Sequence, residues 1–293
     1  MVSSKFGNDA VTRQHLFIHN PGGNLGNFYY IYMKTLNEYI EYIKDTNAKD
    51  GVKDGVKEGL FKNIGAELVV VKTKNELGRL IDKTIMNEGP NCDLNFIGVS
   101  KITDMSDLFA RSNFNGDISG WDVSNVNDMS GMFVGSKFSG DISRWDVSNV
   151  KDMSCMFDHS QFNGDISDWD VSNVNNMGWM FNGCQFNGDI SKWDVSNVTN
   201  MNHMFSNSSF NGDISDWNVS GVKDMSYMFY KSIFIGDISD WDVSKVDDMA
   251  FMFNSSKFSG DISKWNVLKV EDMSSMFSNS KLEKSHKLPE WYK

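Results

Sequence analysis

The 293-residue sequence predicts an α/β solenoid, in which 24-residue coils made of a short parallel strand and a helical turn stack behind a mostly helical N-terminal cap. Three observations predict it. A 24-residue unit recurs without a gap, its apolar residues show strand-like and then helix-like spacing, and a strand and an amphipathic helix precede it. We therefore expect four parts: a helix-rich head or cap region (1–65), a strand plus capping helix (66–89), the repeats (90–281) and a C-terminal cap or tail (282–293).

The N-terminal 65 residues match no recognisable motif. LFIHNPGGNLGNFYYIYMKTLNEYIEYIKD begins with an apolar run and a Gly-rich turn, after which apolar residues recur at helical spacing. KDGVKDGVKEG is a polar connector with glycine breakers. PGGNLG lacks the pattern of a phosphate-binding loop, so we interpret it as a turn. This segment is expected to be a second cap layer or a partner-specific head.

The unit that follows reads as a strand over 67–72 and then a helix. Thr73 and Glu76 have the spacing of a capping box. Gly89 and the proline after it are expected to end the helix. The apolar face is predicted to consist of Leu77, Leu80, Ile81 and Ile85. Such a unit can cover the first coil, which would otherwise expose apolar core and a free strand edge.

Seven full copies of the repeat carry the same residue at eleven positions. Numbering each copy from 1 to 24, these are Phe at 1, Gly-Asp-Ile-Ser at 3–6, Trp at 8, Val at 10 and 13, Met at 16 and 19, and Phe at 20. Since no copy can bury its apolar residues alone, we expect these invariant residues to form a shared core. The copies begin at Phe114, Phe138, Phe162, Phe186, Phe210, Phe234 and Phe258.

A degenerate copy over 90–113 precedes the full ones and keeps their apolar pattern. After the last copy Leu282 holds position 1, and the pattern is then lost in KSHKLPEWYK. The apolar residues of the degenerate copy are Leu94, Ile97, Val99, Ile102, Met105, Leu108 and Phe109.

The spacing inside one copy predicts its local structure. Trp at 8 and Val at 10 alternate with polar residues, which favours a strand. Val at 13, Met at 16 and Met-Phe at 19–20 recur every three or four residues, which favours one or two turns of 3₁₀ or α-helix. Asp or Asn at 15 is placed to cap that turn, and Gly-Asp at 3–4 is typical of a tight turn.

Charge and cysteine content exclude several classes of protein. Residues 1–89 hold 12 Lys/Arg and 11 Asp/Glu, whereas 90–293 hold 16 and 28, a net charge of −12. Such an acidic surface favours a basic protein partner and argues against nucleic-acid binding. The three cysteines show no CxxC spacing and predict neither a disulfide framework nor a zinc site: Cys92, Cys155 and Cys184.

No catalytic motif can be assembled from the sequence. The five histidines have no HExxH spacing, and no nucleophile stands near a base in a recognisable pattern. We therefore expect a protein that is not an enzyme and has no cofactor and no metal centre. The residues as written contain no secretion signal, no lipidation cysteine near the start and no apolar run of 18 residues, which predicts a cytoplasmic location without membrane insertion.

Two acidic columns run through the copies, at positions 4 and 9. The invariant Asp at 4 is expected to close its own Gly-Asp turn by accepting backbone N–H groups; the alternative is calcium held between coils. Position 9 alternates with Trp and Val and so is predicted to point outward from a strand face, either as a binding surface or as a solvated stripe that protects strand edges. Its binding candidates are Asp146, Asp170, Asp194 and Asp242.

Position 18 is the most informative variable position. It lies between the two methionines at 16 and 19 and is predicted to point outward. Aromatic rings on four adjacent copies would form an exposed aromatic ridge, and such rings are enriched at binding hot spots. The alternative is that the rings lie flat as partial core. The aromatic ridge consists of Trp179, His203, Tyr227 and Phe251.

The pattern FNGDISxWDVSNVxxMSxMF resembles the repeat of BspA-type leucine-rich-repeat surface proteins, the class typified by mycoplasma-like surface lipoproteins. The resemblance covers residues 90–281. It implies a right-handed, leucine-rich-repeat-like stack used for protein binding, often on a cell surface.

These observations lead to one main functional hypothesis. A non-enzymatic scaffold for protein–protein interaction would present an acidic strand face and the aromatic ridge to a partner of basic character. The alternative is a calcium-stabilised surface or adhesion module. An ice-binding rod is disfavoured because Gly221, Lys245 and Lys269 interrupt the Asn ladder at position 12 and Leu268 interrupts the Ser ladder at position 11.

Overall fold

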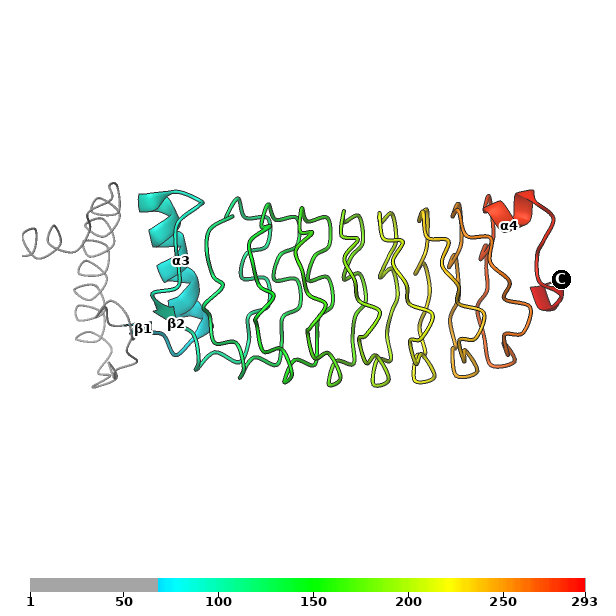
Figure 1. Cartoon of the computed structure of the whole chain (residues 1–293), viewed down its shortest axis with the longest axis horizontal. Helices are drawn as coiled ribbons and strands as arrows, with labels where there is room; N and C mark the ends of the chain where they lie inside the picture. Colours follow the sequence, from blue (N-terminus) through cyan, green and yellow to red (C-terminus); the bar gives the residue numbers. More distant parts are fainter. Residues whose placement is uncertain (1–67, 293) are drawn as a thin grey trace, which may run out of the picture.

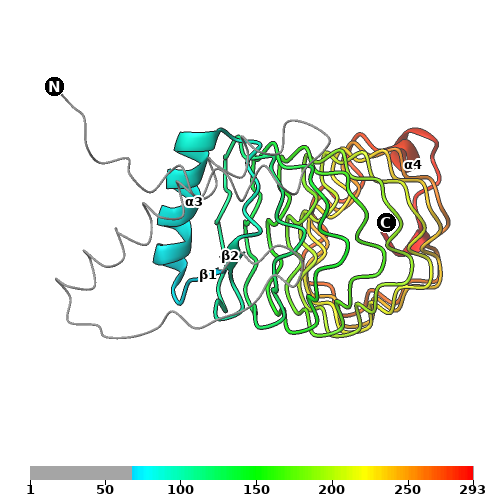
Figure 2. The same ribbon diagram turned by 60° about the vertical axis from the view of Figure 1, so that its left-hand side comes forward.

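The computed structural model describes residues 68–292 and shows successive repeats as coils placed side by side along one long axis (Figure 1). In a view turned by 60°, the coils lie one behind another and have similar outlines (Figure 2). The head predicted for 1–65 lies outside the described residues. The elements in chain order are β1 (Val69–Val70), α3 (Lys74–Glu88), β2 (Ile97–Gly98), α4 (Lys281–Lys284) and a 3₁₀ helix, η1 (Glu290–Tyr292).

The strand and helix expected before the repeats are present as β1 and α3. The Thr73 side chain accepts the backbone N–H of Glu76, whose own side chain accepts the Thr73 N–H, so the predicted capping box is confirmed. Gly89 ends the helix at a φ of 91°, which favours glycine. β1 pairs in parallel with β2, with Val69 opposite Ile97. The helix residues buried toward the coils include Leu77, Leu80 and Ile81.

The invariant apolar residues form the core, as predicted. In the first six full copies Phe, Ile, Trp, Val and Met at the invariant positions are at most 4% exposed. Phe at 20 stacks on Phe at 20 of the next copy with centroids 5.6–5.9 Å apart, and on Phe at 1 just after it at 4.2–4.7 Å. Three invariant positions lie outside this core, because Asp at 4 is exposed and Gly at 3 and Ser at 6 are half-buried in most copies.

The strand expected at Trp 8 and Val 10 is wrong for the seven full copies, where positions 8–10 form no strand, whereas in the degenerate copy β2 (Ile97–Gly98) lies at positions 8 and 9. The backbone bonds between coils instead cluster at positions 14–24. His203 N–H donates to Ser226 O at 2.9 Å, and Phe205 N–H to Met228 O at 3.0 Å. Isolated parallel bridges occur at position 15, for example between Asn200 and Asp224.

The helical turn expected at 13–20 is also replaced by another geometry, a series of overlapping tight turns. Met204 N–H bonds to Met201 O, and Ser206 N–H to His203 O, within one coil. Positions 18 and 22 have a positive φ in every full copy, such as 55° at His203 and 51° at Asn207. A positive φ at the third residue is what a type II turn requires. Alternate N–H groups are thereby free to bond to the next coil.

The tryptophan ladder continues beyond the last full copy. Each repeat Trp donates its indole N–H to the carbonyl of position 5 in the preceding full copy, as Trp193 does to Ile166 O at 3.1 Å. In the C-terminal tail Trp291 donates to Ile262 O at 3.1 Å and so occupies the next place in this ladder. The tail thus caps the coils although its sequence has left the 24-residue register.

Candidate functional site

The aromatic ridge exists as one continuous stack of four rings. Centroid distances are 3.7 Å from Trp179 to His203, 4.3 Å from His203 to Tyr227 and 4.7 Å from Tyr227 to Phe251, with interplanar angles of 8–10°. Trp179 is 36% exposed and the other three are half-buried. Because the rings lie face to face, the ridge presents ring edges along its length, and the faces of the two inner rings are covered.

The backbone holds these rings in a conformation that favours glycine. The φ values are 63° at Trp179, 55° at His203, 57° at Tyr227 and 56° at Phe251, while Gly131 occupies the same position in the first full copy at 63°. A side chain in the left-handed region costs roughly 1–2 kcal/mol, and a stacked aromatic pair contributes about 0.5–1.5 kcal/mol. Cys155 and Ser275 adopt the same conformation at position 18 of other copies, so the turn imposes this cost on any side chain and ring stacking offsets it.

His203 is the polar member of the ridge and is held neutral. Its Nδ1 atom is buried and has no hydrogen-bond partner among residues 68–292. Desolvation lowers the pKa of His203 to about 4, against the opposing effect of Asp224 and Asp158. At neutral pH the ridge is thus an uncharged ring stack.

Replacing this histidine tests the ring stack through its pH dependence. The unfolded chain protonates His203 near pH 6.5, whereas the folded protein does so only near pH 4. Between these values the unfolded state binds more protons, so stability falls as pH falls. We expect His203→Phe to reduce the drop in melting temperature between pH 6.5 and 4, measured by circular dichroism.

The exposed His286 supplies the control for this experiment. His286→Gln should leave the pH dependence of the melting temperature as it is in the wild type. Identical pH profiles for wild type and His203→Phe would contradict the burial of His203 within the ridge.

Two neighbours of the ridge at position 21 were not predicted from the sequence. Tyr230 packs edge-on against Tyr227 at 5.5 Å, and Lys231 Nζ lies 5.0 Å from the Tyr230 ring centroid. Asp158 Oδ1 accepts a hydrogen bond from Asn182 Nδ2 at 2.7 Å and lies 2.6 Å from His159 Nδ1. Position 21, three residues after the ridge position, varies between copies. This variability is the feature of the sequence that could have indicated these neighbours.

The position 9 candidates are exposed, but they form no strand face. Asp146 Oδ1 accepts the Ser148 N–H at 3.1 Å and the Ser148 hydroxyl at 2.6 Å. The hydroxyl bond and then the backbone bond hold the pKa of Asp146 below its ordinary value. Each of these residues thus closes its own turn while its second oxygen faces solvent. An equivalent hydrogen bond, from the backbone N–H of the serine two residues later to the aspartate Oδ1, is accepted by Asp170, Asp194 and Asp242.

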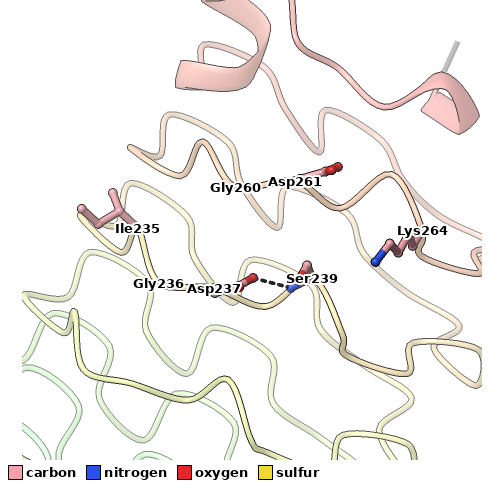
Figure 3. A pocket seen from close by; sticks show the side chains of 7 residues that line it. All are labelled: Ile235, Gly236, Asp237, Ser239, Gly260, Asp261 and Lys264. Atoms are coloured by element: carbon pink, nitrogen blue, oxygen red, sulfur yellow. Dashed lines mark hydrogen bonds between the residues drawn. The ribbon is translucent and has the colours of Figure 1, made fainter.

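The invariant Asp at position 4 closes its own turn, as predicted, with the donor being the serine two residues later. Asp237 Oδ1 accepts the Ser239 backbone N–H at 2.9 Å, which lowers the pKa of Asp237 (Figure 3). Asp237 and Asp261 line a shallow groove of about 330 Å³ between two coils, with Ile235 and Lys264 at its sides (Figure 3). Over residues 68–292 no group of three or more His, Cys, Asp or Glu side chains is placed to hold a metal ion.

The remaining sequence expectations concern cysteines and membrane segments. Cys92, Cys155 and Cys184 are free thiols in the structure. In the described part of the chain no helix has both the length and the apolar character needed to cross a bilayer.

Comparison with known proteins places the chain by its repeats. A model of the family described as "Mycoplasma protein of unknown function, DUF285" matches residues 83–187 and again 179–291. No curated protein and no solved structure gives a match. The two matches together span 83–291, more than half of the sequence, and the chain therefore belongs to this Mycoplasma protein family of unknown function.

Proposed function

We propose that this protein is a non-enzymatic scaffold for protein–protein interaction and that the aromatic ridge is its main contact surface. One observation carries the proposal: four aromatic side chains on adjacent coils form an unbroken stack at a backbone position that favours glycine. A contiguous, partly exposed aromatic surface of this kind supports a role in binding. Because each coil bonds to the next, the rings are held in place before a partner arrives, which reduces the entropic cost of binding.

The charge of the repeat region favours a basic partner. Residues 90–293 hold 16 Lys/Arg against 28 Asp/Glu. The position 9 carboxylates, including Asp146, Asp170, Asp194 and Asp242, are exposed and accept backbone N–H groups of serines, so they supply a negative surface that steers cationic segments toward the coils.

The finer family assignment belongs to the same proposal. We infer a right-handed, leucine-rich-repeat-like α/β solenoid of the BspA type, for which the stacking of 24-residue coils and the repeat pattern are the support. The resemblance further suggests use at a cell surface. No observed contact favours the calcium-stabilised adhesion module, since the position 4 carboxylates already accept serine donors.

A displayed library of random peptides tests the scaffold function. We expect peptides selected on the immobilised protein to be enriched in basic residues. Their affinity should fall at least tenfold for a variant carrying Trp179→Ala, Tyr227→Ala and Phe251→Ala, because the three substitutions remove the ring edges and the open end faces. Affinity is measured by calorimetry or biolayer interferometry.

The control removes exposed apolar residues outside the ridge. Ile235 is 57% and Leu268 93% exposed, and the variants Ile235→Asn and Leu268→Ser restore residues that other copies carry. They should leave peptide affinity unchanged. Selected peptides that bind the triple ridge variant as tightly as the wild type would rule out the ridge as the contact surface.

A further inference from the structure

The ring stack has two ends, and each end leaves one ring face without a stacking partner. His203 and Tyr227 each stack on two rings of the position 18 column, while Trp179 and Phe251 each stack on one. Toward the N-terminal end, the coil beside Trp179 carries Cys155 at this position, and the coil beyond it carries Gly131. A thiol is too small to cover an indole ring, in agreement with the larger exposure of Trp179.

Carboxylates surround the position next to this indole face. Asp158 and Asp152 belong to the same coil as Cys155, and Asp107 reaches over Gly131 from the opposite side, its Oδ1 2.3 Å from where a Cβ on that glycine would lie. Burial first, and then the negative charges of Asp158, Asp152 and Asp107, raise the pKa of the Cys155 thiol to about 11. The thiol is therefore neutral at pH 7. Asp158 Oδ1 already lies 2.6 Å from His159 Nδ1, but a carboxylate has about four acceptor sites, so these three carboxylates can accept further donors from a ligand.

Two of these carboxylates are held in place by neighbouring side chains. Asn182 Nδ2 donates to Asp158 at 2.7 Å, and Asn176 Nδ2 donates to Asp152 Oδ2 at 3.1 Å. The opposite end of the stack lacks this arrangement. Phe251 faces the coil of Ser275, where position 21 is Ser278 in place of an aspartate. Only the Trp179 end combines a large open ring face with several fixed negative charges.

We propose that the Trp179 face, together with Asp158, Asp152 and Asp107, binds the guanidinium group of an arginine side chain in the partner. A guanidinium is planar and weakly hydrated, so it can lie on the indole as a fifth layer of the stack while its N–H groups donate to carboxylates. Tryptophan is the aromatic residue with the strongest attraction for a cation above its face. The inference rests on the proposed function and names the chemistry of its partner.

The test uses three short peptides that are identical except at one residue: arginine, lysine or the uncharged arginine analogue citrulline. The readout is the NMR signal of the Trp179 indole N–H, assigned by its absence in a Trp179→Leu variant. We expect the arginine peptide to shift this signal, the lysine peptide to bind at least threefold more weakly, and the citrulline peptide to give no shift. The Trp193 indole, which is bonded to Ile166 O, is the internal reference.

Three variants locate the binding site. Trp179→Leu and Asp158→Asn should each weaken arginine-peptide binding at least fivefold. Because Trp179→Leu lacks the indole signal, its binding is measured by the shift of the backbone amide signals of residues 155–158. Asn at 158 can still accept the Asn182 donor, so the fold is retained. Leu268→Ser, at an exposed position outside the ridge, is the control and should bind normally. A cooperative unfolding transition establishes that each of the three variants is folded.

Failure of this inference can be told apart from failure of the scaffold proposal. If the arginine peptide does not shift the Trp179 signal, or binds Asp158→Asn as tightly as the wild type, the guanidinium site is wrong, even where library-selected peptides still depend on the ridge. If those selected peptides bind the triple ridge variant unchanged, the scaffold proposal itself is wrong.

Discussion

Replacing Trp193 by alanine is expected to lower the free energy of unfolding by about 3–5 kcal/mol. Trp193 is 4% exposed, packs on Phe181 at 6.3 Å and donates its indole N–H to Ile166 O at 3.1 Å. The substitution leaves a cavity between two coils and removes one of the two donors to the Ile166 carbonyl, which still accepts the Trp169 N–H at 3.2 Å, and both effects are unfavourable. Urea unfolding followed by circular dichroism measures the loss.

A tryptophan in the preceding coil is the matched control for this experiment. Trp179 is 36% exposed and its indole makes no hydrogen bond within the described region. Trp179→Ala should lower the free energy of unfolding by only about 1–2 kcal/mol, because the ring is partly exposed, no buried donor or acceptor loses a partner, and alanine bears the same positive φ as tryptophan. Equal losses for the two variants would contradict the separation of core tryptophans from the ridge.

The second large effect is expected from Gly116→Ala, with a loss of about 3 kcal/mol, at the upper end of the range for overpacking. A Cβ on Gly116 would lie 1.9 Å from the Cys92 carbonyl oxygen and 2.7 Å from the Phe114 ring. The Cys92 carbonyl belongs to the neighbouring coil and accepts the N–H of Asp117, the residue after Gly116, at 3.2 Å. The carbonyl therefore cannot move away without disturbing this hydrogen bond between the coils.

Gly120→Ala, in the same coil, controls for the loss of a glycine as such. Its Cβ would meet only the Asn95 side chain, at 3.0 Å, and other copies carry Arg, Asp or Lys at this position. The change in free energy should stay within about 0.5 kcal/mol. Thermal unfolding of both variants measures the difference, and a Gly116→Ala protein as stable as the wild type would mean that the two coils are farther apart than described here.

Some features could be predicted from residues alone because they depend on burial and local capping. The invariant Phe, Trp, Val and Met residues are interior, and Thr73 with Glu76 starts a helix that ends at Gly89. The invariant Asp at position 4 was expected to cap a turn and does so, with serine as the donor. Each of these features follows from side chains within a few residues of one another.

Other features were missed because apolar spacing does not distinguish between backbone geometries. Residues at 16, 19 and 20 can reach one side from a helical turn or from consecutive tight turns, and the positive φ values at His203 and Asn207 select the turns. The role of Trp291 was missed because the tail completes the ladder by spatial position, after the 24-residue register has ended.

The 24-residue period, the interior residues and the variable aromatic column can all be inferred from the order of residues, since they depend on which side chains recur at equal intervals. The packing of the coils in space turns this column into a stack of rings with outward edges and leaves one indole face open beside carboxylates. The reason is that the hydrogen bonds between coils set the ring spacing, and the coil next to Trp179 determines what covers its face.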